Sequence, residues 1–430
     1  MENISMIKSD ILKEESFLYV LKNGLKVYFV PKLGFSKKYA IFSTNYGSND
    51  NEFVPIGESE AIKVPEGIAH FLEHKLFEEQ EGNIFDEFSK LGSYVNAFTN
   101  FNQTSYLFSC TDNFYKNLEL LVSFVENPYF TDENVDKEKG IIAQEIKMYE
   151  DNPGWKVFFN SLKAMYHYHP VKEDIAGTVE SITKIDKETL YKCYNTFYHP
   201  TNMILFLVGD IDFEKAIDTI EQNIKNKDLN IQSKIERIYP NEPKEIKNRY
   251  IEESLSVSIP LFNIGFKDKD VSFDGNELLK KEIVTNVLLD MIFGESTEFY
   301  KNMYEEGLVN NSFGAQFVAS KTYSHSIIGG ESSNPKKVLD KVIENINHLN
   351  EVGLDKEDFN RIKNKMIGHH IMNFDSLEYI ANSFTKYEFQ NSSLFDYINI
   401  LKEIKFEDIE ERFKSHFTVD NYILSVINPK

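Results

Sequence analysis

Residues 67–77 constrain this chain more than any other segment, because they place two histidines and a glutamate at helical spacing. Apolar residues recur through the segment with a period near 3.6, which predicts one buried stripe of a helix, and Pro65 suits a first helical position. His70, Glu73 and His74 lie beside that stripe at positions i, i+3 and i+4. Residues at this spacing share one face of a helix.

Two imidazoles one helical turn apart can bind a single metal ion, and the carboxylate between them remains available for proton transfer. The order His-x-x-Glu-His is the inverse of the thermolysin-type motif. The spacing therefore predicts His70 and His74 as metal ligands and Glu73 as a general base. At this point two other interpretations stay open: a pair of surface histidines, and a Glu73 that is merely solvated or paired with Lys75.

A catalytic zinc site needs three protein ligands and one open position, so a third donor must come from elsewhere in the chain. Glu145 is the best candidate. It lies in residues 131–149, which begin with capping residues and predict a helix that ends at the Asp-Asn-Pro-Gly sequence of 151–154. Glu138 precedes Glu145 by two helical turns and is expected to face the same way.

The two motifs together resemble those of the pitrilysin/insulinase zinc peptidases, a family that includes the mitochondrial processing peptidase. Further matching stretches are residues 96–99, 138–142, 174–182 and 197–203. The resemblance implies one Zn²⁺ per chain, held by His70, His74 and Glu145. It also implies Glu73 as the general base and Glu138 as a carboxylate that supports the site.

The resemblance implies an α+β fold of two homologous α/β-roll halves, each a mixed sheet with helices packed on it, which together form a clamshell. An offset of about 216 residues relates the His-x-x-Glu-His segment to the second half, and an offset of about 223 relates the helix of Glu145 to it. These offsets place His70, Glu73, His74, Glu138 and Glu145 on Asn286, Leu289, Asp290, Arg361 and Gly368. The second copy is therefore expected to lack the metal chemistry.

The length of 430 residues predicts two domains. We expect a catalytic zinc domain over residues 1–227, a polar linker containing Pro240 and Pro243 over 228–248, and a non-catalytic domain over 249–430. Residues 17–30 predict a β-hairpin around Asn23-Gly24.

Charge and cysteine content exclude several classes of protein. The chain carries 47 Lys and Arg against 68 Asp and Glu, a net charge of −21, which argues against nucleic acid or an anionic membrane as the main partner. Cys110 and Cys193 are far apart and predict packed thiols without a disulfide framework. The first residues lack the apolar core of a signal peptide, so a cytoplasmic protein is expected.

Residues 96–99 (Asn96, Ala97, Phe98 and Thr99) have the pattern of a half-buried strand. In the family that this chain resembles, the corresponding edge strand receives the substrate peptide by β-augmentation. The same resemblance implies an Arg and a Tyr around a Gly-Leu pair in the second half, but Met303 and Asn310 stand there. This departure favours a dimer, either of identical chains or with a metal-free paralogue that supplies peptide-binding groups.

The sequence thus predicts a zinc-dependent endopeptidase that cleaves extended or unfolded peptides by attack of metal-activated water. The alternative is a zinc-bound scaffold or assembly subunit of a heteromeric complex that has no proteolytic activity. The intact set of His70, Glu73, His74 and Glu145 favours the enzyme.

Overall fold

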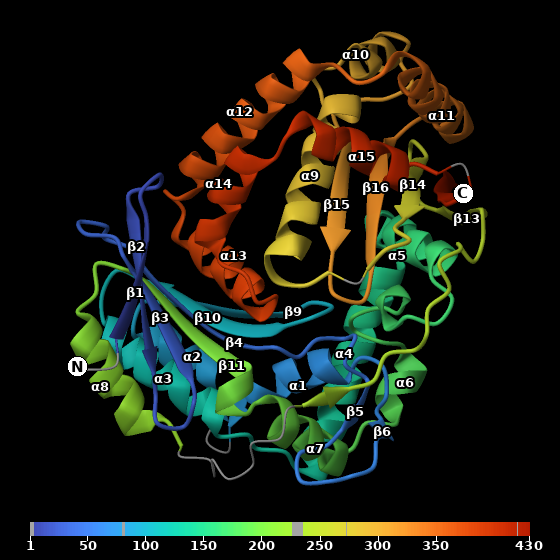
Figure 1. Cartoon of the computed structure of the whole chain (residues 1–430). Coiled ribbons are helices and arrows are strands. Elements are labelled where there is room, and N and C mark those ends of the chain that lie inside the picture. The colour runs from blue at the N-terminus through green and yellow to red at the C-terminus, as the bar shows by residue number, and fades with distance from the viewer. Residues whose placement is uncertain (1–3, 80–81, 226–234, 272, 419) are drawn as a thin grey trace. The chain divides into compact units, whose positions relative to one another are not determined.

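The computed structural model describes residues 4–79, 82–225, 235–271, 273–418 and 420–430 (Figure 1). The chain divides into two compact units. Unit 1 comprises Met1–Ile146, Asp174–Tyr239 and Asn373–Phe389, and unit 2 comprises Lys147–Glu173, Pro240–Met372 and Gln390–Lys430. Each unit holds one large sheet with helices packed on it, which confirms the α+β class.

Unit 1 contains a seven-stranded mixed sheet in the order β1-β2-β3-β11-β4-β10-β9. Its strands are β1 (Ile4–Ser9), β2 (Glu14–Val20), β3 (Lys26–Pro31), β4 (Lys38–Thr44), β9 (Tyr94–Thr99), β10 (Thr104–Cys110) and β11 (Met203–Gly209). The predicted hairpin is confirmed, because β2 and β3 pair antiparallel and Gly24 adopts a left-handed φ of 86° in the turn between them. β3 and β11 form the parallel pair of the sheet.

The other elements of unit 1 are mostly helices. They are α1 (Ile68–Leu76), α2 (Ile84–Lys90), α3 (Phe114–Glu126), α4 (Asp132–Glu150, whose last turn is counted in unit 2), α6 (Val179–Thr183), α7 (Lys187–Phe197), η2 (Pro200–Asn202), α8 (Phe213–Asn223) and α13 (Leu377–Phe389). The short strands are β5 (Glu52–Val54), β6 (Ile62–Lys63), β7 (Glu78–Glu79), β8 (Gly82–Asn83) and β12 (Glu236–Arg237).

Unit 2 contains a five-stranded sheet in the order β13-β17-β14-β16-β15. Its strands are β13 (Tyr250–Leu255), β14 (Leu261–Lys267), β15 (Gly314–Ala319), β16 (Ser324–Glu331) and β17 (Tyr422–Pro429). Its helices are α5 (Pro153–Met165), η1 (Pro170–Lys172), α9 (Gly275–Phe293), α10 (Glu298–Glu305), α11 (Pro335–Val352), α12 (Lys356–Asn373), α14 (Leu394–Glu403) and α15 (Phe406–His416).

The two sheets share one topology. The five strands β3-β11-β4-β10-β9 of unit 1 have the same order and directions as β13-β17-β14-β16-β15 of unit 2, with the single parallel pair in the same place. The expectation of two similar sheet-and-helix halves is therefore confirmed. The clamshell arrangement of the halves stays a prediction.

The units do not follow the sequential boundaries expected from the sequence. Helix α5 belongs to unit 2 because it packs on β14 and β17, whereas α13 belongs to unit 1 because it packs on β4 and β11 (Figure 1). In unit 1, Phe384 of α13 lies beside Tyr28 and Phe206 of the sheet. Each half of the sequence thus lends one helix to the core of the other unit.

The expected linker over residues 228–248 is only partly a linker. Residues 228–234 lie outside the described part of the chain, and β12 within the remainder pairs with β5 of unit 1. Beyond it, Glu242 accepts hydrogen bonds from the backbone N–H groups of residues 167–169 in unit 2. The strand pairing of β12 and the hydrogen bonds of Glu242 therefore hold parts of residues 235–248 against the protein.

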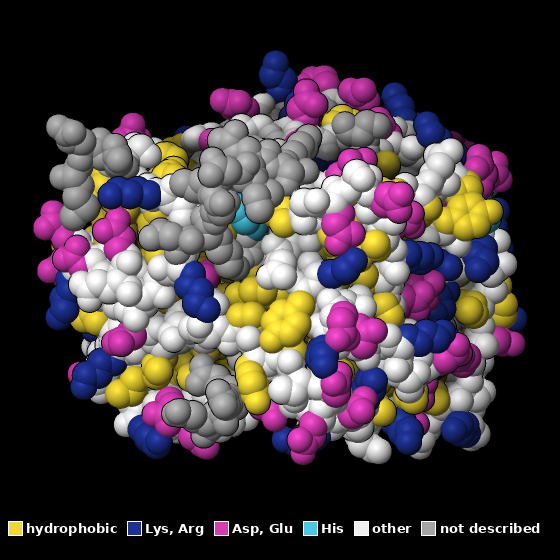
Figure 2. All heavy atoms as spheres, turned by 90° about the horizontal axis from the view of Figure 1, so that it is seen from below, with side chains coloured by type: hydrophobic (Ala, Val, Ile, Leu, Met, Phe, Trp, Pro, Cys, Tyr) yellow, Lys and Arg dark blue, Asp and Glu magenta, His cyan; other side chains and the backbone are white. Residues whose placement is uncertain are grey.

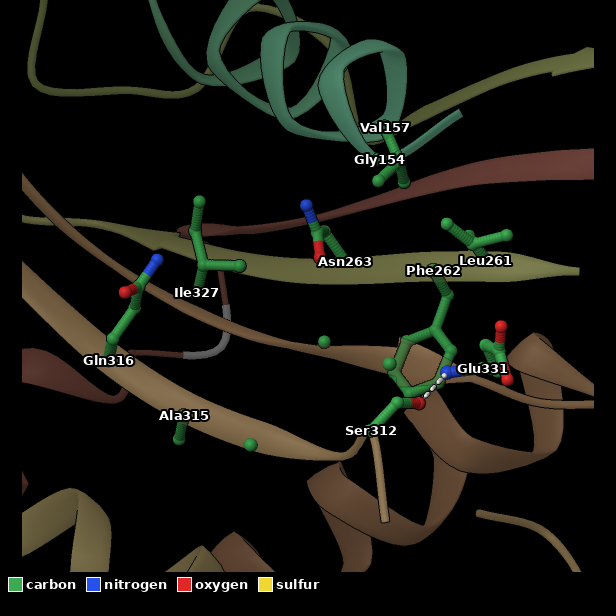
Figure 3. A pocket seen from close by; sticks show the side chains of 13 residues that line it. Gly154, Val157, Leu261, Phe262, Asn263, Ser312, Ala315, Gln316, Ile327 and Glu331 are labelled. Atoms are coloured by element: carbon green, nitrogen blue, oxygen red, sulfur yellow. Dashed lines mark hydrogen bonds between the residues drawn. The ribbon is translucent and has the colours of Figure 1, made fainter. Parts of the chain in front are cut away.

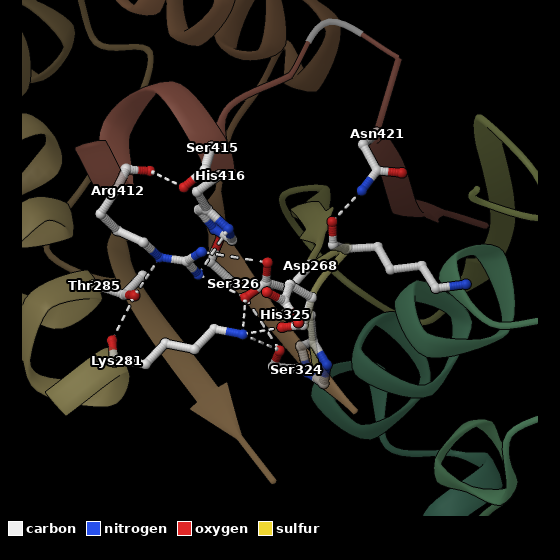
Figure 4. Close-up of polar contacts among 12 residues, drawn as sticks. Asp268, Lys281, Thr285, Ser324, His325, Ser326, Arg412, Ser415, His416 and Asn421 are labelled. Carbon is white, nitrogen blue, oxygen red and sulfur yellow. Dashed lines mark hydrogen bonds and ion pairs between the residues drawn. The ribbon is translucent and has the colours of Figure 1, made fainter. Parts of the chain in front are cut away.

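A buried ion network ties the elements of unit 2 together (Figure 4). Asp268, just after β14, binds Lys281 of α9 at 2.8 Å and Arg412 of α15 at 2.6 Å. Arg412 also donates to Thr285 Oγ1 and to His416 Nδ1. The two cations hold the pKa of Asp268 below its ordinary value even though burial acts in the opposite direction.

Charged residues are dispersed on the face drawn in Figure 2, where acidic and basic side chains alternate with small apolar areas. Cys110 and Cys193 are buried free thiols, as predicted. Among the residues that the structure describes, no helix combines the length and apolar character needed to cross a membrane.

Candidate metal centre

Helix α1 begins at Ile68, three residues later than the position of Pro65 suggests. Gly67 caps the helix with a left-handed φ of 87°, which interrupts helical geometry before Ile68. A Cβ at Gly67 would lie 2.3 Å from the carbonyl oxygen of Ala176, so this close approach requires glycine. The contact fixes the start of α1 against residues 176–177 of unit 1.

The structure brings His70, His74 and Glu145 together in unit 1. One donor atom from each lies within 4.8 Å of the other two, with His70 Nε2 3.6 Å and His74 Nε2 3.4 Å from the two oxygens of Glu145. Ligand atoms about 2.0–2.2 Å from one tetrahedral ion lie roughly 3.3–3.6 Å apart. Two imidazoles and one carboxylate gathered within 4.8 Å are a donor set that suits Zn²⁺.

The two histidines differ in what holds them. His74 Nδ1 lies 3.1 Å from Glu138 Oε1. Burial lowers the pKa of His74, but the bond to Glu138 and the neighbouring carboxylates outweigh it, so the pKa lies above the ordinary value. His70 Nδ1 is buried without a hydrogen-bond partner among the described residues, and burial together with His74 lowers its pKa to about 3. His70 is thus neutral at pH 7, the form that binds a metal.

Glu73 lies on the same helix and has a distinct environment. Its Oε2 accepts a hydrogen bond of 2.8 Å from the Thr99 hydroxyl on β9, and Thr99 lies 3.2 Å from the Thr104 hydroxyl on β10. Burial raises the pKa of Glu73 to about 7, although His74 and Thr99 act to lower it. A pKa near neutrality suits a group that accepts and returns a proton.

Glu73 and Lys75 have different partners, so the alternative in which they pair with each other is wrong. Lys75 Nζ is turned to Glu78 and to Glu138, whereas Glu73 is turned to Thr99. Strand β9, which holds Asn96, Ala97, Phe98 and Thr99, is the terminal strand of the sheet and lies against α1. Its role as a peptide-binding strand stays a prediction.

Two contacts were not anticipated from the sequence. The Thr99 side chain reaches Glu73, although the sequence singled out this residue only as part of a strand. Lys75 is fully buried behind Glu138, although a lysine is usually exposed. Only the alternation of the strand pattern, which puts Thr99 on one face of β9, hinted at the first contact.

The other histidines near prolines do not join the site. His169 and His199 precede Pro170 and Pro200, and each accepts a backbone N–H bond at the start of the short helices η1 and η2. Neither belongs to the cluster of possible metal ligands found among the described residues.

Unit 2 has its own cavity of about 490 Å³ between α5 and its sheet (Figure 3). Asn263, Gln316 and Ile327 lie on the sheet face that α5 covers. The Ser312 hydroxyl, at the edge of the cavity, accepts a hydrogen bond of 2.9 Å from the Glu331 N–H. A side chain at Gly329 would collide with Asn263. Among the described residues, the lining contains one carboxylate, Glu331, and no histidine, so it differs from the cluster of two histidines and carboxylates in unit 1.

Met303 and Asn310, which stand where the family resemblance implies a peptide-binding Arg and Tyr, make other contacts. Met303 on α10 is 2% exposed and belongs to the core of unit 2. Asn310 donates to Glu331 Oε2 at 2.8 Å and accepts from Ser312 in a local turn. Met303 lacks the charge of the implied Arg, and Asn310 lacks the aromatic ring and hydroxyl of the implied Tyr.

Known proteins similar to this chain agree with that resemblance. Residues 53–179 match "Insulinase (Peptidase family M16)", and residues 184–366 match "Peptidase M16 inactive domain". The chain is 43% identical over 427 residues to "Uncharacterized zinc protease YmfH" of Bacillus subtilis, covering 99% of this chain and 100% of that protein. It is 24% identical over 434 residues to "Zinc protease PqqE" of Helicobacter pylori, covering 95% and 91%.

Solved structures give the same answer. A putative M16-like peptidase from Alicyclobacillus acidocaldarius superposes with a TM-score of 0.93 at 36% identity, covering 97% of this chain and 99% of that one. Pitrilysin superposes with a TM-score of 0.74 at 15% identity, covering 100% of this chain and 47% of that one, a likeness of fold alone. On these matches, this chain belongs to the insulinase (M16) family of zinc peptidases.

Proposed function

We propose that this protein is a zinc-dependent endopeptidase that cleaves extended or unfolded peptides. The single observation that carries the proposal is the convergence of His70, His74 and Glu145 beside a buried Glu73. The relatives named as zinc proteases support the choice of zinc. One Zn²⁺ per chain, held by the three ligands, would supply a Lewis acid that polarises the scissile carbonyl and acidifies a water molecule.

The chain's own residues would divide the remaining work. Glu73 would take the proton of the attacking water on Oε1, since Oε2 is held by Thr99, and then deliver it to the leaving amine. Glu138 would fix the orientation of His74 through Nδ1. Strand β9 would hold the substrate backbone by adding it to the edge of the sheet, which selects for extended segments.

The test is digestion of an unstructured peptide mixture by the purified chain, followed by mass spectrometry. Internal cleavage that stops with a chelator and returns with added zinc is the expected result. A chain that binds zinc tightly yet leaves every peptide intact would contradict the proposal and favour the scaffold alternative.

We also propose that the chain acts as a dimer, with itself or with a metal-free paralogue, in the cytoplasm. The buried Met303 and the locally bonded Asn310 support this, because unit 2 lacks the implied peptide-holding Arg and Tyr at these places. Oriented binding of a peptide contributes several kcal/mol to barrier reduction, roughly 7 or more in favourable cases. The test is to measure cleavage at increasing concentration of the chain alone and of the chain mixed with a candidate paralogue. Activity independent of both concentrations would contradict it.

A further inference from the structure

Lys75, the residue directly after the second histidine of the motif, has a burial that its type does not explain. Its side chain is 0% exposed. Lysines are almost never fully buried unless they are paired. Lys75 Nζ contacts a Glu78 oxygen closely and lies 3.7 Å from Glu138 Oε2. The lysine therefore has carboxylate partners inside the protein, and one of them belongs to the metal centre.

Glu138 connects Lys75 to the metal ligand. One of its oxygens, Oε2, faces Lys75, and the other, Oε1, lies 3.1 Å from His74 Nδ1. A carboxylate that accepts from Nδ1–H leaves Nε2 as the unprotonated ring nitrogen. His74 Nε2 is the atom 3.4 Å from Glu145 Oε2, so it is the one turned to the proposed ion.

Charge explains why a cation is needed behind Glu138. Glu138 lies 3.1 Å and Glu145 3.4 Å from the His74 ring, and Glu145 lies 3.6 Å from His70, so two carboxylates are close together in a poorly solvated site, where like charges repel. A buried ammonium on the far side of Glu138 offsets part of this repulsion and fixes which oxygen is turned to His74. The exposed Lys137 cannot do the same, since it contacts Glu78 at 3.5 Å and is 65% exposed.

His70 lacks the support that Glu138 gives to His74. Its Nδ1 has no hydrogen-bond partner among the described residues, so of the two histidines it is His74 whose ring is oriented by a carboxylate at Nδ1. Removal of a group that hydrogen-bonds to a metal-ligating histidine typically lowers metal affinity by about 10- to 100-fold.

We propose that Lys75 is a positioning residue of the metal centre: it acts through Glu138 on His74 and thereby sets the affinity for zinc. The inference rests on the proposed function only in taking the ion to be zinc. It does not require that the protein cleave peptides.

The test measures the zinc dissociation constant of the full chain by competition with a fluorescent chelator. We expect Lys75→Met, which keeps most of the length of the side chain but removes its charge, to weaken zinc binding about tenfold. Lys137→Met is the matched control, because it removes a neighbouring cation that also contacts Glu78, and it should change the constant less than about twofold.

A double-mutant cycle separates positioning from general damage to the fold. If Lys75 acts through Glu138, Lys75→Met should weaken zinc binding about tenfold in the wild-type chain and less than about threefold in Glu138→Gln. The thermal midpoint of each metal-free variant reports the state of the fold independently. Should Lys75→Met not fold, Lys75→Gln completes the same cycle, because it keeps a hydrogen-bond donor without the charge.

Each outcome decides the matter. Loss of zinc affinity that disappears in the Glu138→Gln background supports the role. Equal loss in both backgrounds, or wild-type affinity in Lys75→Met, overturns it. A wild-type chain that binds zinc without cleaving peptides removes the proposed function but leaves this test intact, whereas a wild-type chain that binds no zinc overturns both.

Discussion

Helices α1 and α4 of unit 1 correspond in sequence to helices α9 and α12 of unit 2, and in each unit the two helices are joined by a polar contact, His74–Glu145 in unit 1 and Asp290–Lys365 in unit 2. Helix α1 lies against the terminal strand β9, and α9 lies against the terminal strand β15. Helix α4 covers Asp132–Glu150, and α12 covers Lys356–Asn373, almost the range that the offset of about 223 residues predicts. The backbone scaffold is shared, so differences in chemistry arise from individual side chains.

The corresponding residues have different partners in unit 2. Asn286, in the place of His70, accepts the Phe317 N–H of β15 at 3.2 Å. Leu289, in the place of Glu73, is 1% exposed in the core. Asp290, in the place of His74, binds Lys365 of α12 at 2.8 Å. Each of these three side chains is thus packed or bonded within unit 2. In unit 1, by contrast, imidazoles and a carboxylate converge on one point.

The largest effect is expected when a ligand of unit 1 is removed. Glu145→Ala or His74→Ala should lose zinc and all measurable peptidase activity, because two remaining ligands hold the ion poorly. Zinc content after gel filtration and the peptide assay check this together. The matched control is Asp290→Ala, at the place of His74 in unit 2, which should keep the zinc of the wild-type chain. Full zinc content in Glu145→Ala would assign the third ligand to another residue.

Loss of the proton acceptor should separate activity from metal binding. Glu73→Gln keeps the size of the side chain and its contact with Thr99 but cannot accept the proton, so activity should fall by about 10²- to 10⁴-fold with zinc retained. Near-normal kcat in a zinc-loaded Glu73→Gln chain would remove Glu73 from the base role. Leu289→Met, at the corresponding place of unit 2, should leave kcat unchanged.

The sequence predicted the parts of this comparison that depend on local spacing. The Asn23-Gly24 turn, the start of α4 at Asp132 and the meeting of His70, His74 and Glu145 all followed from short motifs or from the family resemblance. It did not predict that α5 packs on the sheet of unit 2 and α13 on the sheet of unit 1. The sequence of an amphipathic helix shows that one face is buried, but it does not show which sheet covers that face. It missed the burial of Lys75 for a similar reason, since its carboxylate partner Glu138 lies on another helix.

Acid should weaken unit 2 through its buried histidines. Burial lowers the pKa of His325 and His416 to about 3 and that of His169 and His370 to about 4, and Arg412 also lowers the pKa of His416. Because these folded-state values lie below the ordinary 6.5, the stabilisation is complete above about pH 6.5 and is lost as pH falls toward 4, by about 1.4 kcal/mol per pH unit for each histidine.

Hydrogen exchange of unit 2 peptides between pH 7 and pH 4, corrected for intrinsic rates, measures this loss. His416 is the best group to change, because its Nδ1 accepts from Arg412 and its Nε2 lies 2.7 Å from Ser326 Oγ, so it cannot take a second proton in place (Figure 4). His416→Gln should flatten the pH dependence by about one proton. An unchanged slope in this variant would show that His416 does not contribute.

The smallest effect is expected at the Asp290–Lys365 pair, and it defines the limit of the comparison. Lys365 is 45% and Asp290 22% exposed, so water screens their attraction and the pair should contribute about 0–1 kcal/mol to the free energy of unfolding. Asp290→Asn, Lys365→Met and the double variant form a cycle in urea denaturation whose coupling energy should fall within that range. Zinc content and kcat should stay at the wild-type values in all three. A loss of peptidase activity in Asp290→Asn, with zinc retained and the fold intact, would mean that helices α9 and α12 of unit 2 take part in the reaction. The conclusion that unit 1 carries the chemistry and unit 2 does not would then be wrong.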